Sequence, residues 1–181
     1  MYKRQFDASF NPLSLKFADP GIPKVWAPFG IQALGGNVFV TYAKQDPTGL
    51  TPVPGEGLGY VDEFTPDGTL VGRVASKGSS RAPLNAPWGL ALAPSNFGAY
   101  SGDLLVGNFG NGRISSYEQL PSGKWAYKGQ LRVANGTPIA LDGLWAIAFG
   151  NGASAGPRRS RGCSSGPQGQ AHGLFGFIAA G

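Results

Sequence analysis

The amino-acid sequence predicts an all-β protein, and three observations lead to this fold class. Short runs of β-branched, aromatic and aliphatic residues, such as 37–43 and 103–109, are bounded by Gly, Pro, Asn or Asp, which is typical of strands. Gly68, Gly112 and Gly123 stand where tight hairpin turns need a positive φ. No segment carries apolar residues at the i, i+3, i+4, i+7 spacing of a long amphipathic helix. An internal repeat supports the same fold class.

The repeat is clearest in three stretches that each have an aromatic residue at the third position. They are APFGIQAL (27–34), APWGLALA (86–93) and GLWAIAFG (143–150), which bring Phe29, Trp88 and Trp145 into register. These aromatic residues are 59 and 57 positions apart. A fixed period of this kind is typical of repeat architectures, in which every unit forms the same group of strands.

Each repeat unit contains four predicted strands. After the first strand comes a second, 37–43 in one unit and 103–109 in the next, and then a hairpin, 59–74 or 112–131. Four strands per repeat is the signature of a β-propeller blade, although WD and kelch blades repeat every ~40 to 50 residues. Loops such as 44–57 account for the longer period.

The repeat is incomplete at both ends of the chain. Residues 6–17 resemble the third and fourth strands of a preceding blade, and 172–178 resemble the third strand of the last blade. A closed propeller typically needs 4 to 8 blades, so the sequence predicts a partial β-propeller over 6–178, an arc of about three blades. The predicted parts are the end of a preceding blade (6–20), two blades (27–77 and 85–134) and an incomplete blade (142–178).

The same stretches carry a family resemblance. Residues 27–46, 84–114, 141–152 and 171–178 resemble the C-terminal half of a family of uncharacterised, mostly bacterial, conserved hypothetical proteins. Its members are predicted to be secreted six-bladed propellers of the NHL or TolB type. The resemblance implies a protein roughly twice this length that carries an export signal, and an extracellular or periplasmic location. It implies no activity.

Two stretches depart from the family pattern. Met1–Gln5 matches the translation of a sequencing adapter, which predicts a metagenomic assembly artefact; a natural basic N-terminus is the alternative. No apolar signal-peptide region follows it. Residues 152–168 lack the apolar second strand that the last blade should have, through a frameshift or a natural loop insertion. Cys163 and the neighbouring Arg residues are therefore poor evidence for function.

Composition excludes several function classes. Charged residues make up 14% of the chain, and part of the net charge of +5 comes from clusters near the two ends. A nucleic-acid groove would instead need basic and aromatic residues interleaved along one surface. No apolar run approaches the roughly 20 residues that span a bilayer. A single cysteine excludes an internal disulfide and a cysteine-based metal site.

Three motifs that could carry chemistry are better explained by local structure. GNFGNG (107–112) lacks the Gly-Lys-Ser/Thr of a phosphate loop and leads into a strand, so we interpret it as a hairpin turn. His172 is the single histidine and forms no recognisable Ser-His-Asp arrangement, which favours a structural role. Asn135 to Thr137 matches a glycosylation acceptor, but such short motifs occur by chance.

A calcium site is the strongest enzymatic alternative. In the calcium-dependent phosphotriesterase and gluconolactonase group, Asn and Asp at the starts of inner strands converge on Ca²⁺, which prefers oxygen ligands. Asn85 and Asp142 precede inner-strand signals and resemble such ligands, whereas the first repeat has Trp26 and Ala27 at the matching place. Asp142 could instead cap a turn before Gly143.

The repeated aromatic residues are predicted to pack between adjacent blades. Phe29, Trp88 and Trp145 would each bury a large apolar surface there, and a ligand platform lining the tunnel is the alternative. Gly89 would let a neighbouring backbone approach closely. Asp46, Asp62 and Asp103 are interpreted as loop or strand-edge residues.

These observations favour a non-enzymatic binding or interaction propeller without a cofactor, whose ligand is an unknown protein or small molecule. One alternative is a Ca²⁺-dependent hydrolase resembling the phosphotriesterases and gluconolactonases. The other is a purely structural extracellular module, which would have no polar pocket at the mouth of the tunnel.

Overall fold

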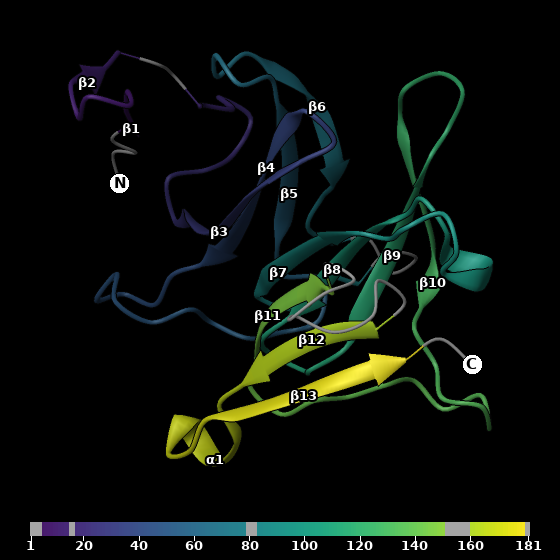
Figure 1. Cartoon of the computed structure of the whole chain (residues 1–181). Coiled ribbons are helices and arrows are strands. Elements are labelled where there is room, and N and C mark those ends of the chain that lie inside the picture. The colour runs from purple at the N-terminus through teal and green to yellow at the C-terminus, as the bar shows by residue number, and fades with distance from the viewer. Residues whose placement is uncertain (1–4, 15–16, 79–82, 151–159, 180–181) are drawn as a thin grey trace.

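The computed structural model describes residues 5–14, 17–78, 83–150 and 160–179, and its regular structure is almost entirely strand (Figure 1). The strands are β1 (Gln5–Phe6), β2 (Pro12–Leu13), β3 (Trp26–Leu34), β4 (Asn37–Lys44), β5 (Tyr60–Phe64), β6 (Leu70–Ala75), β7 (Pro87–Leu92), β8 (Leu104–Asn108), β9 (Ile114–Gln119), β10 (Trp125–Gln130), β11 (Leu144–Phe149), β12 (Ser160–Ser165) and β13 (Leu174–Ala179). A short 3-10 turn (Gly98–Tyr100) and α1 (Pro167–Gln170) complete the list. The all-β prediction is confirmed.

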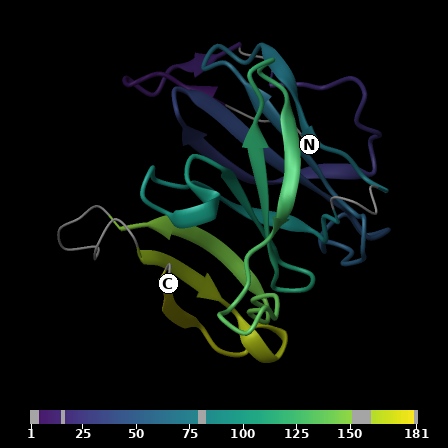
Figure 2. The ribbon, with the colours of Figure 1, turned by 90° about the vertical axis from the view of Figure 1, so that its right-hand side faces the viewer.

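Three antiparallel sheets follow one another along the chain as meanders. The first blade is β3–β4–β5–β6, the second is β7–β8–β9–β10, and the third is β11–β12–β13. The first strands are neighbours across blades, because β7 contacts both β3 and β11. The sheets spread outward from these strands (Figures 1 and 2). This arrangement is that of a partial β-propeller, as predicted.

A bulge at the start of each first strand sets a common register for the three blades. It falls between Pro28 and Gly30, between Pro87 and Leu90, and between Leu144 and Ile147. Beyond the bulge, Ile31 pairs with Val40, Leu90 with Val106, and Ile147 with Cys163. Positions in different blades can therefore be compared one by one.

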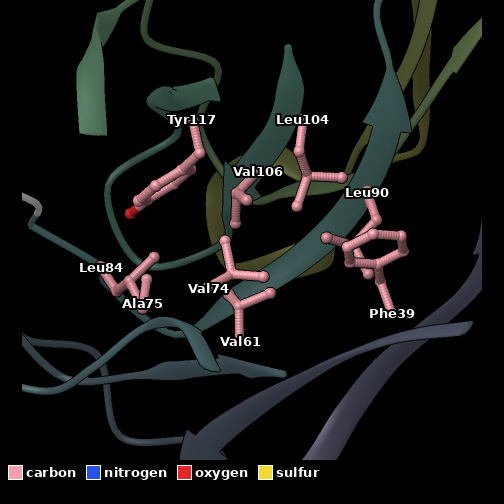
Figure 3. Close-up of a cluster of buried hydrophobic side chains, with 9 residues drawn as sticks. All are labelled: Phe39, Val61, Val74, Ala75, Leu84, Leu90, Leu104, Val106 and Tyr117. Carbon is pink, nitrogen blue, oxygen red and sulfur yellow. The ribbon is translucent and has the colours of Figure 1, made fainter. Parts of the chain in front are cut away.

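The hydrophobic core lies between adjacent blades. Figure 3 shows one cluster, in which Phe39 and Val61 of the first blade meet Leu90, Leu104 and Tyr117 of the second. A second cluster joins the second and third blades. Each fully buried apolar side chain of this kind contributes about 1.5–3 kcal/mol. Apolar packing between sheets is thus what orients the blades.

The prediction that the last blade lacks its second strand is wrong. Within residues 152–168, Ser160–Ser165 forms β12, which pairs with both β11 and β13. Residues 151–159 lie outside the described part of the chain. The sequence carries no strand pattern here because most side chains of β12 are small or polar, and Cys163 is its buried apolar residue. Backbone pairing on both sides defines the strand instead.

Asp62 also differs from its prediction as a loop or strand-edge residue. It lies within β5 with no exposed surface, and its carboxylate accepts a hydrogen bond from Nε of Arg73 at 3.1 Å. Arg73 also pairs with Asp19 and lies over the Tyr60 ring at 4.9 Å. Burial, reinforced by the Asp62 charge, raises the pKa of Tyr42 beside it. These groups attach the segment before β3 to the first blade.

The N-terminal residues form a separate hairpin. β1 pairs with β2, and the hairpin lies beyond the first blade, at the end of the molecule opposite β13 (Figures 1 and 2). Residues 1–4 lie outside the described ranges, so the adapter interpretation of Met1–Gln5 stays a prediction, as do the blade boundaries. Within the described chain, no helix is long and apolar enough to cross a membrane.

Candidate functional site

Four aromatic rings meet where the three first strands run side by side. Phe29, Trp88 and Trp145 come from β3, β7 and β11, and Phe109 comes from the turn after β8. The Phe29 and Trp88 ring centroids lie 4.5 Å apart, and those of Trp88 and Trp145 lie 6.3 Å apart. Phe109 lies 6.0 Å from Phe29 and 6.1 Å from Trp88. We call these four residues the aromatic cluster.

The bulges explain why the rings meet. In each first strand the aromatic residue occupies the bulge itself, where the ladder is locally interrupted. A bulge adds twist and re-aims a side chain. The rings from successive blades therefore point toward one another, and each remains partly exposed.

A small residue after each aromatic allows the strands to approach. A Cβ atom on Gly89 would lie 2.7 Å from the Trp145 carbonyl oxygen, and one on Gly30 would overlap the Trp88 carbonyl oxygen. Real Cβ atoms do not come this close to backbone atoms, so these positions require glycine. The third blade has Ala146 at the same position. The glycine after the aromatic residue thus allows neighbouring blades to pack closely.

Two small pockets adjoin the aromatic cluster. One, of about 90 Å³, is bordered by Trp88, its neighbours and residues of the two flanking first strands. The other, of about 140 Å³, is bordered by Phe29 and Val40 among others. Their linings consist of apolar side chains and glycine backbone, and the first pocket is also bordered by the polar side chain of Gln32. The site can therefore make contacts with a ligand that presents an apolar face.

Phe109 belongs to the cluster although the sequence did not identify it. The turn GNFGNG joins β8 to β9, as predicted, and Gly112 has a φ of 68° there. The Phe109 N–H donates to the Ala86 carbonyl at 3.0 Å, which holds the turn against the start of β7. An apolar ring in a turn otherwise made of Gly and Asn was the signal that it packs on another element.

Asn85 connects two loops by hydrogen bonds. It is 8% exposed, and its Oδ1 accepts a hydrogen bond from the Gly55 N–H at 2.7 Å. Its own N–H donates to Oδ1 of Asn108 at 2.9 Å. The Asn85 side chain therefore holds the loop between β4 and β5 against the second blade.

Asp142 is exposed and forms a hydrogen bond with another loop. Its Oδ2 accepts a hydrogen bond from the Gln168 N–H at 3.0 Å, in the connection between β12 and β13. The adjacent Gly143 has a φ of 60°, and its carbonyl accepts from Gly166 at 2.9 Å. Asn85 and Asp142 thus each bind a backbone N–H of a separate loop.

Asn85 and Asp142 alone are too few ligands for a calcium ion. Ca²⁺ takes 6–8 oxygen ligands, several of them carboxylates. Across the described ranges, no group of three or more His, Cys, Asp or Glu residues could hold a metal ion. The oxygens identified above, on Asn85 and Asp142, already accept backbone hydrogen bonds.

The remaining candidate residues lie outside the aromatic cluster. His172 is exposed in the turn before β13. Cys163 is buried in the cluster between the second and third blades, and its thiol donates to the Gly176 carbonyl at 3.4 Å. Oδ1 of Asn135 accepts from the Thr137 N–H at 3.0 Å, which forms a local turn.

Comparison with known proteins finds viral relatives without a known function. No family model matches the chain. It is 38% identical over 130 residues to the uncharacterised protein R640 of Acanthamoeba polyphaga mimivirus, which covers 71% of this chain and 23% of R640. It is 36% identical over 149 residues to protein R648 of the same virus, covering 79% of this chain and 35% of R648. The chain spans less than two fifths of these relatives, and their viral origin does not support a mostly bacterial family.

A solved structure supports the fold. The chain resembles a protein named provisionally as a gluconolactonase, with a TM-score of 0.55 and 20% sequence identity. The match covers 94% of this chain and 54% of that protein. At this identity the likeness shows a propeller-like fold. It also shows that the described blades correspond to about half of a larger propeller-like chain.

Proposed function

We propose that the chain is part of a non-enzymatic binding propeller whose aromatic cluster contacts the ligand. The observation that carries the proposal is that four rings from three blades contact one another and still stay partly exposed beside a pocket. Rings that serve only to fill the core, such as Phe64 with no exposed surface, are fully covered. Partly exposed aromatic residues around a pocket are typical of small-molecule sites.

The lining indicates the chemistry of the ligand. The pocket beside Trp88 is lined by glycine backbone, by apolar side chains such as Ile147, and by the neutral amide of Gln32, and no charged residue lines it. Aromatic faces contact apolar ring faces well. We therefore propose a neutral ring with an apolar face, such as a pyranose sugar or its lactone. We also propose an extracellular or periplasmic location, which rests on the family resemblance alone.

A fluorescence titration tests this binding role. Methyl β-D-glucopyranoside and δ-gluconolactone are added separately while tryptophan emission is followed. We expect a saturable change with at least one of them, which Trp88→Leu abolishes while circular dichroism still reports the strands. Trp125→Phe removes a tryptophan from an outer strand and should keep the response. A response that survives Trp88→Leu, or none from the folded protein, contradicts the proposal.

A calcium-dependent lactone hydrolase is the second candidate. It is favoured by the fold shared with the protein named provisionally as a gluconolactonase. The same protein is incubated with δ-gluconolactone, with Ca²⁺ and then with a chelator, and ring opening is followed by acid release. Turnover that needs Ca²⁺ and is lost in Asp142→Asn would replace the binding role by hydrolysis. Binding without turnover favours the first candidate.

A further inference from the structure

We propose that Gln32 is the specificity-determining residue of the binding site, and that the preferred ligand is a sugar ring joined to an apolar group. Gln32 lies on β3, between the pocket beside Trp88 and a second cavity further along the first strands. Its amide would bind hydroxyl groups of the sugar, and the second cavity would take the apolar group. This inference rests on the binding role proposed above and narrows the class of ligand.

The repeat identifies Gln32 as an exception. Gln32, Ala91 and Ala148 share one position of the repeat, as their partners on the second strands show. Two of the three blades thus carry a methyl group where the first blade carries a neutral amide. The packing of a blade does not require the amide, because the other two blades form without it.

The Gln32 side chain lies on the side of the first blade that the second blade covers. Residues directly opposite each other on paired strands share a face, and the partner of Gln32 is Phe39, which belongs to the core between these two blades. Gln32 is nevertheless exposed, whereas Ala91 at the same position is 3% exposed. Since the covering blade is present in the chain, the ends of the chain do not explain this exposure.

Gln32 stands where two cavities adjoin. The pocket beside Trp88 measures about 90 Å³ and the second cavity about 230 Å³. Gln32, Leu90 and Ile147 border both. The two spaces are therefore neighbours along the first strands, and a ligand that occupies both passes Gln32.

The amide of Gln32 is free to bind a neutral polar group. A glutamine amide offers both donors and acceptors, and no hydrogen bond within the described part of the chain engages it. Among the described residues, none with a charge borders either cavity. In small-molecule sites, a few polar groups in an apolar lining fix the orientation and specificity of the ligand. Gln32 is suited to this role for a ligand with neighbouring hydroxyl groups.

The second cavity is apolar apart from Gln32. Leu34, Leu92 and Phe149 border it, one from each of the three first strands. An apolar cavity of about 150 Å³ is large enough to bind benzene, so the second cavity has room for a phenyl ring. Its lining favours an apolar substituent over a second sugar, whose hydroxyl groups would lose their bonds to water.

Calorimetric titrations with phenyl β-D-glucopyranoside and methyl β-D-glucopyranoside test the inference on the 181-residue chain. We expect the phenyl glycoside to bind more than about tenfold more tightly, because its ring leaves water for an apolar cavity. Leu92→Asp should remove this preference, since it places a charge in that cavity. Leu92 is 37% exposed, so the folded protein can accommodate the change.

Gln32→Ala should weaken the binding of both glycosides by about 3- to 10-fold, the usual effect of losing a neutral hydrogen bond. Alanine occupies the same position in the other two blades, which favours a folded variant. Gln119→Ala is the matched control, because Gln119 lies on β9 and borders neither cavity. It should leave both affinities unchanged.

The outcomes separate this inference from the binding role. Equal affinities for the two glycosides, or affinities that Gln32→Ala leaves unchanged, would overturn the inference, whereas binding that is lost in Trp88→Leu would still support the aromatic cluster as the site. Failure of both glycosides to bind the folded protein would overturn the inference together with the binding role. If a variant fails to fold, the preference of the unaltered chain between the two glycosides still decides.

Discussion

Individual residues determine how closely the blades approach, and glycine is the clearest case. Gly89 follows Trp88 in β7, where the neighbouring strand β11 comes so near that a Cβ atom would lie 2.7 Å from the Trp145 carbonyl oxygen and 3.1 Å from the Ile147 nitrogen. Both neighbours are backbone atoms, which cannot rotate away as a side chain would. The strands would have to separate to admit even a methyl group.

Gly89→Ala should therefore destabilise the protein by about 1–3 kcal/mol, the usual cost of overpacking. Urea denaturation followed by circular dichroism measures the change. Gly72→Ala is the matched control, because Gly72 lies in strand β6 and a Cβ atom there meets nothing within 4 Å. Equal effects of the two substitutions would show that β7 and β11 are not in close contact.

Tyr117 provides a second test at this scale. It is 1% exposed in the core shown in Figure 3, and its hydroxyl has no hydrogen-bond partner among the described residues. The equivalent position of the first blade is Phe64, as the pairing with Leu104 and Val38 shows. The hydroxyl is thus not needed for packing at this position.

Tyr117→Phe should leave stability unchanged or raise it by about 1 kcal/mol, because an unsatisfied buried hydroxyl is removed. Burial raises the pKa of Tyr117 above the usual value of 10.0, so its contribution to stability is present below that pH and is lost as the pH rises. The variant should lose less stability than the parent above about pH 10. Alkaline urea titrations measure both effects, and a strong destabilisation at neutral pH would reveal a partner for the hydroxyl.

At the level of residues, the sequence predicted part of the site. The common register of Phe29, Trp88 and Trp145 could be read directly, because the repeat preserves the bulge position. Phe109 could not, since its place in the cluster depends on a turn folding back onto β7. The burial of Asp62 could not be predicted from the sequence either, because its partner Arg73 lies on the next strand of the hairpin.

Among the elements, the outer strand of the second blade is joined to the first blade by a polar contact. Nε1 of Trp125, on β10, donates to Oε2 of Glu63, on β5, at 2.8 Å. Nδ2 of Asn37 donates to the other oxygen of Glu63 at 2.6 Å. The Trp125 ring also packs edge-on against Phe39, with the centroids 5.8 Å apart. This contact fixes the second blade against the first, far from the first strands.

Trp125→Phe keeps an aromatic ring against Phe39 but removes the donor to Glu63. We expect a loss of about 1.5–3 kcal/mol, the usual value for a hydrogen bond to a charged group. In a Glu63→Gln background the same substitution should cost less, so a double-mutant cycle in urea isolates the coupling. A coupling near zero would mean that packing alone joins these strands.

Most strands could be predicted from the sequence, and the failures have physical causes. β4 and β8 could be predicted because their own runs of apolar and β-branched residues are typical of strands. β12 was missed because a central strand built of small and polar residues is defined by its two neighbours rather than by its own pattern. The β1–β2 hairpin overlaps residues 6–17, which were predicted as the last two strands of a preceding blade, but each of its strands is only two residues long.

For the whole molecule, the repeat predicts an arc, and the structure shows why the arc has two unlike ends. Leu90 and Ile147 share a repeat position with Ile31 and are buried, whereas Ile31 is exposed. Val61 and Ile114 share a repeat position with Phe175 and are buried, whereas Phe175 is exposed. Sequence periodicity could indicate that blades were missing from a ring. It could not indicate which side chains would be left exposed, because that depends on the register of paired strands.

Consecutive first strands, nearly 60 residues apart in sequence, lie side by side in this fold. NOE spectroscopy of aromatic protons tests it directly. We expect cross-peaks between the Phe29 and Trp88 rings, whose centroids are 4.5 Å apart, and weaker ones between Trp88 and Trp145, at 6.3 Å. A folded, strand-rich protein that shows neither set of cross-peaks would contradict the propeller arrangement.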